Sequence, residues 1–189
     1  MALANCKNTE ITAHFRYTRK FLLHYRYDAH KPLRERQNAG FFTASLGITL
    51  KLRNAEVRPG KIVSRFSKEE AIVLANSWLS IFGEKPAPHM HDFMWHVFSH
   101  GSYPSVALQK AHDAYQNIAS PEYIVLSNDR DEAFITDQKP TSSCFSDYYI
   151  FPKNLAWTMV FTHEDGWLGP FFAKHRDFEK LNHENLKKS

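Results

Sequence analysis

Two short segments of the chain hold the side chains best suited to chemistry. The first contains Trp95, His96 and Ser99, and the second is the tripeptide from Thr162 to Glu164, with His163 between them. A histidine beside a carboxylate can act as a general base, and a serine can act as a nucleophile or orient another group. The candidate catalytic residues are therefore His96, Ser99, His163 and Glu164.

The same histidines also suit a metal site, which would be a second kind of chemistry. Two histidines and a glutamate can hold a metal ion and leave one coordination position open. If the chain is helical from about His91, then Asp92, His96 and His100 recur every four residues and share one face. The chain has 11 histidines, however, so this spacing also arises by chance. No metal or other cofactor is predicted, and the candidate ligands for a metal are His96, His100 and His163.

Both segments also have an interpretation without chemistry. The segment from Trp95 to Ser99 can pack in the core with one hydrogen-bonded polar pair, and Thr162 to Glu164 can end a strand by bonding to the turn before Gly169. The chain has only seven glycines, none in a G-x-G-x-x-G array, and it has no nucleophile elbow. The sequence thus leaves a catalytic and a structural role open.

A third possibility is recognition of another protein. Trp167 lies between Gly166 and Leu168, in a stretch that turns sharply before Pro170. An aromatic side chain exposed in a loop suits the centre of an interface, where tryptophan is enriched. The candidate binding residues are Trp95, Thr162 and Trp167.

Two sequence motifs resemble a small bacterial family of unknown function. The chain reads W-T-M-V-F-T-H-E from Trp157 and G-P-F-F from Gly169, where the family pattern is W-T-x-V-x-T-H-E followed by G-P-x-F. It also reads F-M-W-H-V-F-S from Phe93, where the family has F-L-W-H-x-F-S. The resemblance covers roughly residues 66 to 174, departs at Met94 and around residues 165 to 168, and brings no established activity. It implies that one shared design includes His96, Ser99, Thr162, His163, Glu164, Gly169 and Pro170.

The elements that must position these residues are mostly strands. Asp147 to Phe151 and Ala156 to Thr162 are rich in aromatic and β-branched residues, and Pro152 to Asn154 between them indicates a hairpin turn. Tyr123 to Ser127 and Ala133 to Thr136 are predicted strands as well. Ahead of them, Ser67 and Glu70 form a capping box that begins a helix, which ends at about Phe82 before Gly83.

This order of elements predicts an α+β fold. The sheet is antiparallel, with a C-terminal meander of about four strands and two or three helices on one face. The domain is predicted to span residues 61–189, with Arg58-Pro59-Gly60 as the turn at its boundary.

Residues 1–60 form a predicted N-terminal extension that is basic and aromatic-rich. They hold 11 Lys and Arg against 4 Asp and Glu, whereas the whole chain of 189 residues has a net charge of +4. Cations and rings interleave from Ile11 to His30, which suits single-stranded nucleic acid, although no recognised nucleic-acid motif is present. The alternatives are an amphipathic element that packs on the core, a segment on an anionic membrane surface, or a weakly ordered extension.

Composition also predicts the compartment. No apolar run approaches the roughly 20 residues needed to span a bilayer, and the first residues lack the order of a signal peptide. The only two cysteines are Cys6 and Cys144, without metal-ligand spacing. A cytoplasmic protein with reduced thiols is expected.

Two functional hypotheses follow. The first is a non-enzymatic, protein-binding bacterial domain, immunity-like or regulatory. The alternative is a small hydrolase, possibly metal-dependent, that uses a cluster of histidine and glutamate. Convergence of His96 and His163 at an open site would favour the hydrolase, and burial of both would disfavour it.

Overall fold

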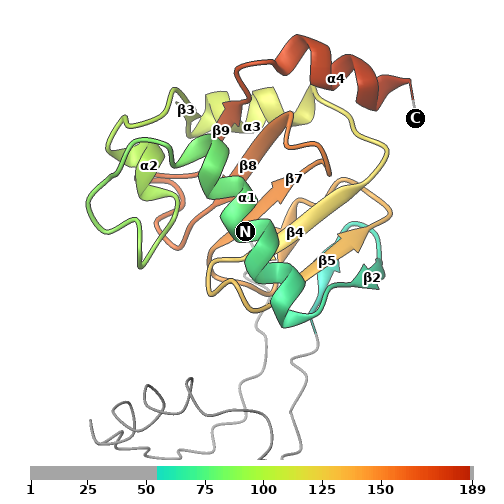
Figure 1. Cartoon of the computed structure of the whole chain (residues 1–189). Coiled ribbons are helices and arrows are strands. Elements are labelled where there is room, and N and C mark those ends of the chain that lie inside the picture. The colour runs from blue at the N-terminus through green and yellow to red at the C-terminus, as the bar shows by residue number, and fades with distance from the viewer. Residues whose placement is uncertain (1–54, 188–189) are drawn as a thin grey trace, which may run out of the picture. The chain divides into compact units, whose positions relative to one another are not determined.

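The computed structural model describes residues 55–187 of the chain (Figure 1). The predictions for the first 54 residues, which include the segment from Ile11 to His30 and Cys6, lie outside the described residues. The boundary placed at residue 60 stays a prediction.

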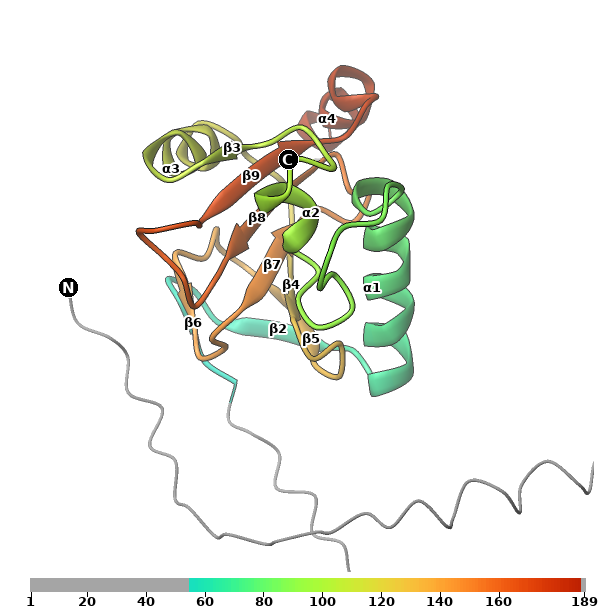
Figure 2. The same ribbon diagram turned by 90° about the vertical axis from the view of Figure 1, so that its left-hand side faces the viewer.

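An antiparallel sheet of seven strands forms the centre of the described fold, in the order β2-β5-β4-β7-β8-β9-β3. Its strands are β2 (Ile62–Arg65), β3 (Val106–Ala107), β4 (Tyr123–Ser127), β5 (Ala133–Thr136), β7 (Tyr148–Phe151), β8 (Trp157–Phe161) and β9 (Phe171–Lys174). Two further short strands, β1 (Val57–Arg58) and β6 (Ser142–Ser143), pair with each other. Figure 2 shows β4, β7, β8 and β9 side by side. The predicted antiparallel α+β fold and its C-terminal meander are confirmed.

The predicted hairpin of β7 and β8 is also confirmed, and it lies in the middle of the sheet. Tyr148 pairs with Phe161, and Ile150 pairs with Met159. Every residue of both strands is buried. Strands that carry apolar groups on both faces need a cover on each side, and the helices supply it.

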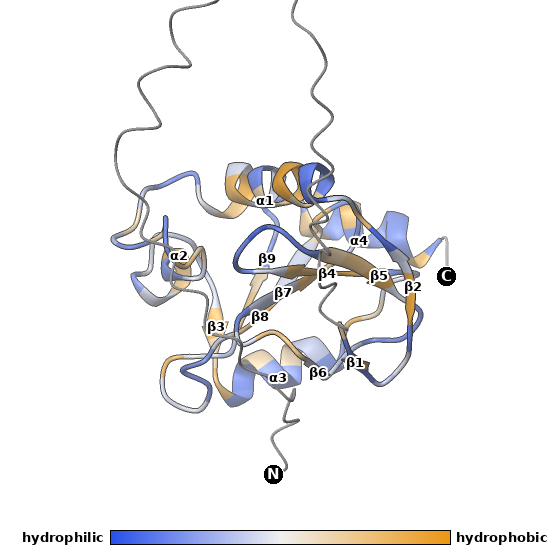
Figure 3. Cartoon of the chain, turned by 90° about the horizontal axis from the view of Figure 1, so that it is seen from below, coloured by the Kyte–Doolittle hydropathy of each residue, from blue (hydrophilic) through white to orange (hydrophobic). Residues whose placement is uncertain are grey.

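Four helices lie in the described chain, α1 (Lys68–Phe82), α2 (His96–Ser99), α3 (Gln109–Gln116) and α4 (Phe178–Leu186). The capping box of α1 is present as predicted, because the Glu70 amide donates to the Ser67 hydroxyl and the Ser67 amide donates to the Glu70 carboxylate. In Figure 3 α1 lies on one side of the sheet and α3 on the other.

The buried side chains accordingly form two clusters, one on each face of the sheet. One cluster joins α1 and α2 to the sheet through Trp78, Phe98 and Tyr149. The other joins α3 to the opposite face through Tyr115 and Trp157. The face under α1 and α2 is the one that carries Trp95 and the short helix that begins at His96.

The prediction of a helix from about His91 is wrong. Residues 89–95 form successive turns, and only the four residues of α2 are helical. His89 has a φ of 58°, which is outside the helical region, and Pro86 and Pro88 precede it. Asp92 therefore does not share a helical face with His96 and His100.

No helix in the described part of the chain is long and apolar enough to cross a membrane.

Candidate functional site

A buried carboxylate joins the two segments singled out from the sequence. Asp147 immediately precedes β7 and is 7% exposed. Its Oδ1 accepts hydrogen bonds from Trp95 Nε1 at 3.0 Å and from the His163 backbone amide at 3.1 Å. The same oxygen lies 2.9 Å from His163 Nδ1, and Oδ2 lies 3.0 Å from it. One side chain thus ties the turn before α2 to the end of β8.

His163 is held at one ring nitrogen, while much of its side chain is exposed. Its side chain is 45% exposed, while that of its partner Asp147 is 7% exposed. Because a carboxylate only accepts hydrogen bonds, the proton between them belongs to Nδ1, and in the neutral imidazole Nε2 then carries a lone pair. The ring lies 5.1 Å from that of Phe93 and 6.0 Å from that of Trp95, centroid to centroid.

His96 packs against the same tryptophan. Its ring centroid is 4.1 Å from that of Trp95, and its Nδ1 is 3.0 Å from Ser99 Oγ. Burial lowers the pKa of His96 below its ordinary value of 6.5, and the nearby His100 and His89 lower it further. Two carboxylates, those of Glu164 and Asp92, act in the opposite direction on this pKa.

Two side chains that the sequence did not single out fix the turn before α2. The Trp95 amide donates to the hydroxyl of Tyr149, which in turn donates to Asn128 Oδ1 at 2.8 Å. Asn128 Nδ2 also donates to the Asp92 carbonyl at 2.8 Å. Burial raises the pKa of Tyr149 well above its ordinary value, so its hydroxyl keeps the proton that it donates. Trp95 is therefore positioned through both its amide and its indole.

The loop that follows β8 has a closely bonded backbone. The Glu164 carbonyl accepts from the amides of Trp167 at 3.0 Å, Leu168 at 3.1 Å and Gly169 at 3.4 Å. The Gly166 amide donates to the Gly169 carbonyl at 3.0 Å, and this closes the loop. Trp167 stands at its tip with 74% of its surface exposed.

Gly169 is required where this loop returns to the sheet. A Cβ atom at this position would lie 2.4 Å from Thr162 Oγ1 and 3.1 Å from Thr162 Cγ2. The hydroxyl of Thr162 and Oε2 of Glu164 are buried there without a hydrogen-bond partner. Close packing of this kind keeps Thr162 and Gly169 together and fixes the ends of the loop.

The structure brings together most of the predicted site residues. Trp95, His96, Ser99 and His163 form one continuous set of contacts, and His100 lies beside His96 with 5.4 Å between ring centroids. Glu164 contributes its charge near His96, and Thr162 packs under the loop. Trp167 stands apart at the loop tip.

Sequence reasoning missed Asp147 and Phe93 as members of the cluster. Phe93 has ring contacts with both His96 and His163, at 6.0 and 5.1 Å. A signal for Asp147 existed, since an acidic residue directly before a fully apolar strand must either face solvent or find partners. Which partners it finds is not a property of the local sequence.

In the described residues 55–187, no group of three or more His, Cys, Asp or Glu side chains is placed to hold a metal ion. The three candidate ligands include two whose Nδ1 is already engaged, His96 with Ser99 and His163 with Asp147.

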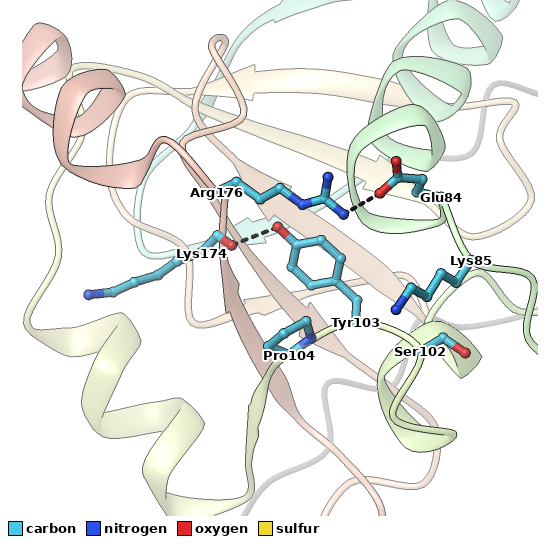
Figure 4. Close-up of a pocket in the computed structure, with 7 residues that line it drawn as sticks. All are labelled: Glu84, Lys85, Ser102, Tyr103, Pro104, Lys174 and Arg176. Carbon is cyan, nitrogen blue, oxygen red and sulfur yellow. Dashed lines mark hydrogen bonds and ion pairs between the residues drawn. The ribbon is translucent and has the colours of Figure 1, made fainter.

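A cavity of about 290 Å³ lies elsewhere in the described fold (Figure 4). It is lined by Glu84, Lys85, Ser102, Tyr103, Pro104, Lys174 and Arg176. Arg176 pairs with Glu84 at its edge, and the Tyr103 hydroxyl donates to the Lys174 carbonyl at 2.9 Å. None of the predicted site residues lines this cavity.

Comparison with known proteins agrees with the resemblance found in the sequence. Residues 79–172 match the model of a family described as a domain of unknown function (DUF4275), which confirms the prediction of such a family. The matched segment contains α2, both histidines of the cluster and the Trp167 loop. No match was found among curated proteins or among solved structures.

Proposed function

We propose that this domain binds another protein and that Trp167 is the anchor of the interface. The observation that carries the proposal is a tryptophan with 74% of its surface exposed, at the tip of a loop whose backbone is fixed by hydrogen bonds. Tryptophan is enriched among the residues that contribute most binding energy, and a large ring in water gains much from burial in a partner's pocket.

The rigidity of the loop favours binding because little freedom remains to be lost. Three amides converge on the Glu164 carbonyl, and Gly169 packs against Thr162 where a larger residue has no room. A loop already ordered in the free protein avoids part of the entropy cost of association.

Apolar neighbours extend the surface beyond one side chain. Leu168 is 36% exposed on the same loop, while Val106 and Leu108 are 39% and 41% exposed near the edge strand β3. The Leu108 amide donates to the Pro170 carbonyl at 2.9 Å, which places this residue beside the return of the loop. Together these residues supply an apolar centre for an interface.

The charges beside the anchor indicate the character of the partner. Glu164 and Asp165 belong to the same loop, and Asp165 is exposed. Carboxylates at the rim of an interface favour a partner with basic groups around its pocket and raise the association rate at low salt. An apolar pocket with a basic rim is therefore the expected complement.

The test is capture of partners by the full chain, with Trp167→Ala as the variant and Val73→Ala as the matched control. Val73 is an apolar residue of α1 that is 62% exposed, so it controls for non-specific hydrophobic binding. The proposal expects at least one protein retained by the wild type and by the control but lost by Trp167→Ala. With that partner purified, the dissociation constant should rise by roughly 30-fold or more, as for a hot-spot residue.

Equal capture by all three proteins, or a dissociation constant unchanged by Trp167→Ala, would contradict the proposal. Titration at increasing salt tests the rim separately, because screening should slow association without removing the contribution of Trp167.

A further inference from the structure

We propose that His163, oriented by Asp147, is a general base that hydrolyses neutral carboxylic esters. This activity is independent of the binding proposed for Trp167. It rests on a geometry in which one imidazole nitrogen meets a buried carboxylate while nearly half of the ring is open to solvent.

The hydrogen bonds of Asp147 decide which ring nitrogen of His163 acts as the base. Its carboxylate is 2.9 Å from His163 Nδ1, and it also accepts from the His163 amide and from Trp95 Nε1. The Nδ1 proton is thereby fixed, which leaves Nε2 as the nitrogen with a lone pair on a side chain that is 45% exposed. A carboxylate placed in this way holds the tautomer and stabilises the imidazolium formed in the reaction.

The surroundings of His163 favour an uncharged and partly apolar substrate. The half-buried ring of Phe93 lies 5.1 Å from that of His163 and offers an apolar surface beside the imidazole. Carboxylates surround the pair of histidines: Asp147 bonds His163, while Glu164 and Asp92 act on His96. Their negative charge disfavours phosphate esters and leaves neutral carboxylic esters as the favoured class.

The nucleophile in this arrangement is water. Ser99 is hydrogen-bonded to His96, 3.0 Å from its Nδ1, and belongs to the same short helix. The His163 ring is hydrogen-bonded to the two oxygens of Asp147. An imidazole without a protein nucleophile can still activate a water molecule.

The reaction then proceeds in two balanced steps. Nε2 takes a proton from water as the water oxygen bonds to the carbonyl carbon, and the carbonyl electron pair moves onto oxygen. When the tetrahedral intermediate collapses, the bond to the alcohol oxygen breaks and the Nε2 proton passes to that oxygen. One ester and one water give one acid and one alcohol, and His163 returns to its starting state.

The decisive variant is His163→Asn, measured in the full chain with phenyl acetate and p-nitrophenyl acetate as probes. The asparagine amide can still donate to Asp147 from the place of Nδ1, but it has no group in the place of Nε2. The hydrolysis rate should fall roughly 100-fold, which is the usual contribution of a general base. His91→Ala removes an exposed histidine outside the cluster and should leave the rate unchanged.

Asp147→Asn tests the positioning role. Loss of the negative charge should lower kcat with little change in KM, since the imidazolium formed in the transition state loses its counter-charge. A purely structural role of Asp147 would not produce a loss confined to kcat.

A rate for His163→Asn equal to that of the wild type would overturn the proposal, because any contaminating esterase is common to both preparations. Faster cleavage of p-nitrophenyl phosphate than of p-nitrophenyl acetate would overturn the assigned substrate class. An unchanged kcat in Asp147→Asn would overturn the part given to the carboxylate.

Discussion

Two tryptophans, Trp95 before α2 and Trp167 in the loop after β8, have opposite surroundings. Trp95 is 1% exposed, and both its amide and its indole nitrogen are hydrogen-bonded. Trp167 is 74% exposed and stands on a loop that is closed by backbone hydrogen bonds. The fold uses the first ring to hold the cluster of Asp147 and His163 in place, and leaves the second available to another molecule.

The difference shows why residue type alone does not assign a role. Both tryptophans lie within two residues of a histidine or an acidic residue in the sequence, and both are candidate binding residues. Only Trp95 lies where a buried carboxylate needs a donor. Because Trp95 is buried, its removal should lower the free energy of unfolding strongly. Because Trp167 is exposed, its removal should change that free energy little in the absence of a partner.

Among the substitutions that test this contrast, Trp95→Ala is expected to have the largest effect on stability. It removes a buried indole and the donor to Asp147, and should lower the free energy of unfolding by about 3–5 kcal/mol. Denaturant unfolding measures it. Trp95→Phe keeps most of the ring but not the N–H, so its smaller loss isolates the hydrogen bond. Equal losses in the two variants would show that the indole nitrogen contributes most of the effect and ring volume little.

Gly169→Ala should have the next largest effect, about 1–3 kcal/mol, because its Cβ would lie 2.4 Å from Thr162 Oγ1. Adding Thr162→Ala removes the obstructing hydroxyl and methyl groups and should restore most of the stability. The double-mutant cycle measures this coupling, and strictly additive losses would place the strain elsewhere.

A smaller effect concerns pH and contrasts His96 with the exposed histidines. The pKa of His96 is lowered by burial first and by His100 and His89 next, so the unfolded chain binds its proton more readily than the folded one. Its contribution to stability is therefore present above about pH 6.5 and is lost as pH falls from there towards the folded pKa. His100→Ala should raise the pKa of His96 in an NMR titration and flatten this pH dependence. A pKa for His96 that is unchanged by His100→Ala would contradict the charge interaction.

The smallest effect is expected for Trp167→Ala in the absence of a partner. An exposed side chain contributes little to folding, so the free energy of unfolding should stay within about 0.5 kcal/mol of the wild type. Thermal or denaturant unfolding checks this. A loss as large as that of Trp95→Ala would mean that the ring is covered within the chain, and the contrast between the two tryptophans would disappear.

The local features of the fold were predictable from the sequence because their causes are local. The capping box of Ser67 and Glu70, the hairpin around Pro152 and the strand from Trp157 to Phe161 each follow from residues a few positions apart. The helix expected before His96 failed for a reason of the same kind. Asp92, His96 and His100 have helical spacing, but residues 89–95 form turns instead, beginning at His89 with its positive φ.

The sequence by itself determined the antiparallel α+β class, the place of the two motifs and the types of side chain available to a site. Only the tertiary structure decided that Asp147 is their common partner. Its contact with Trp95 spans 52 positions and its contact with His163 spans 16, so both depend on strand register and on the docking of the turn before α2. A buried carboxylate takes whichever donors the packing brings within reach, and that choice belongs to the whole fold.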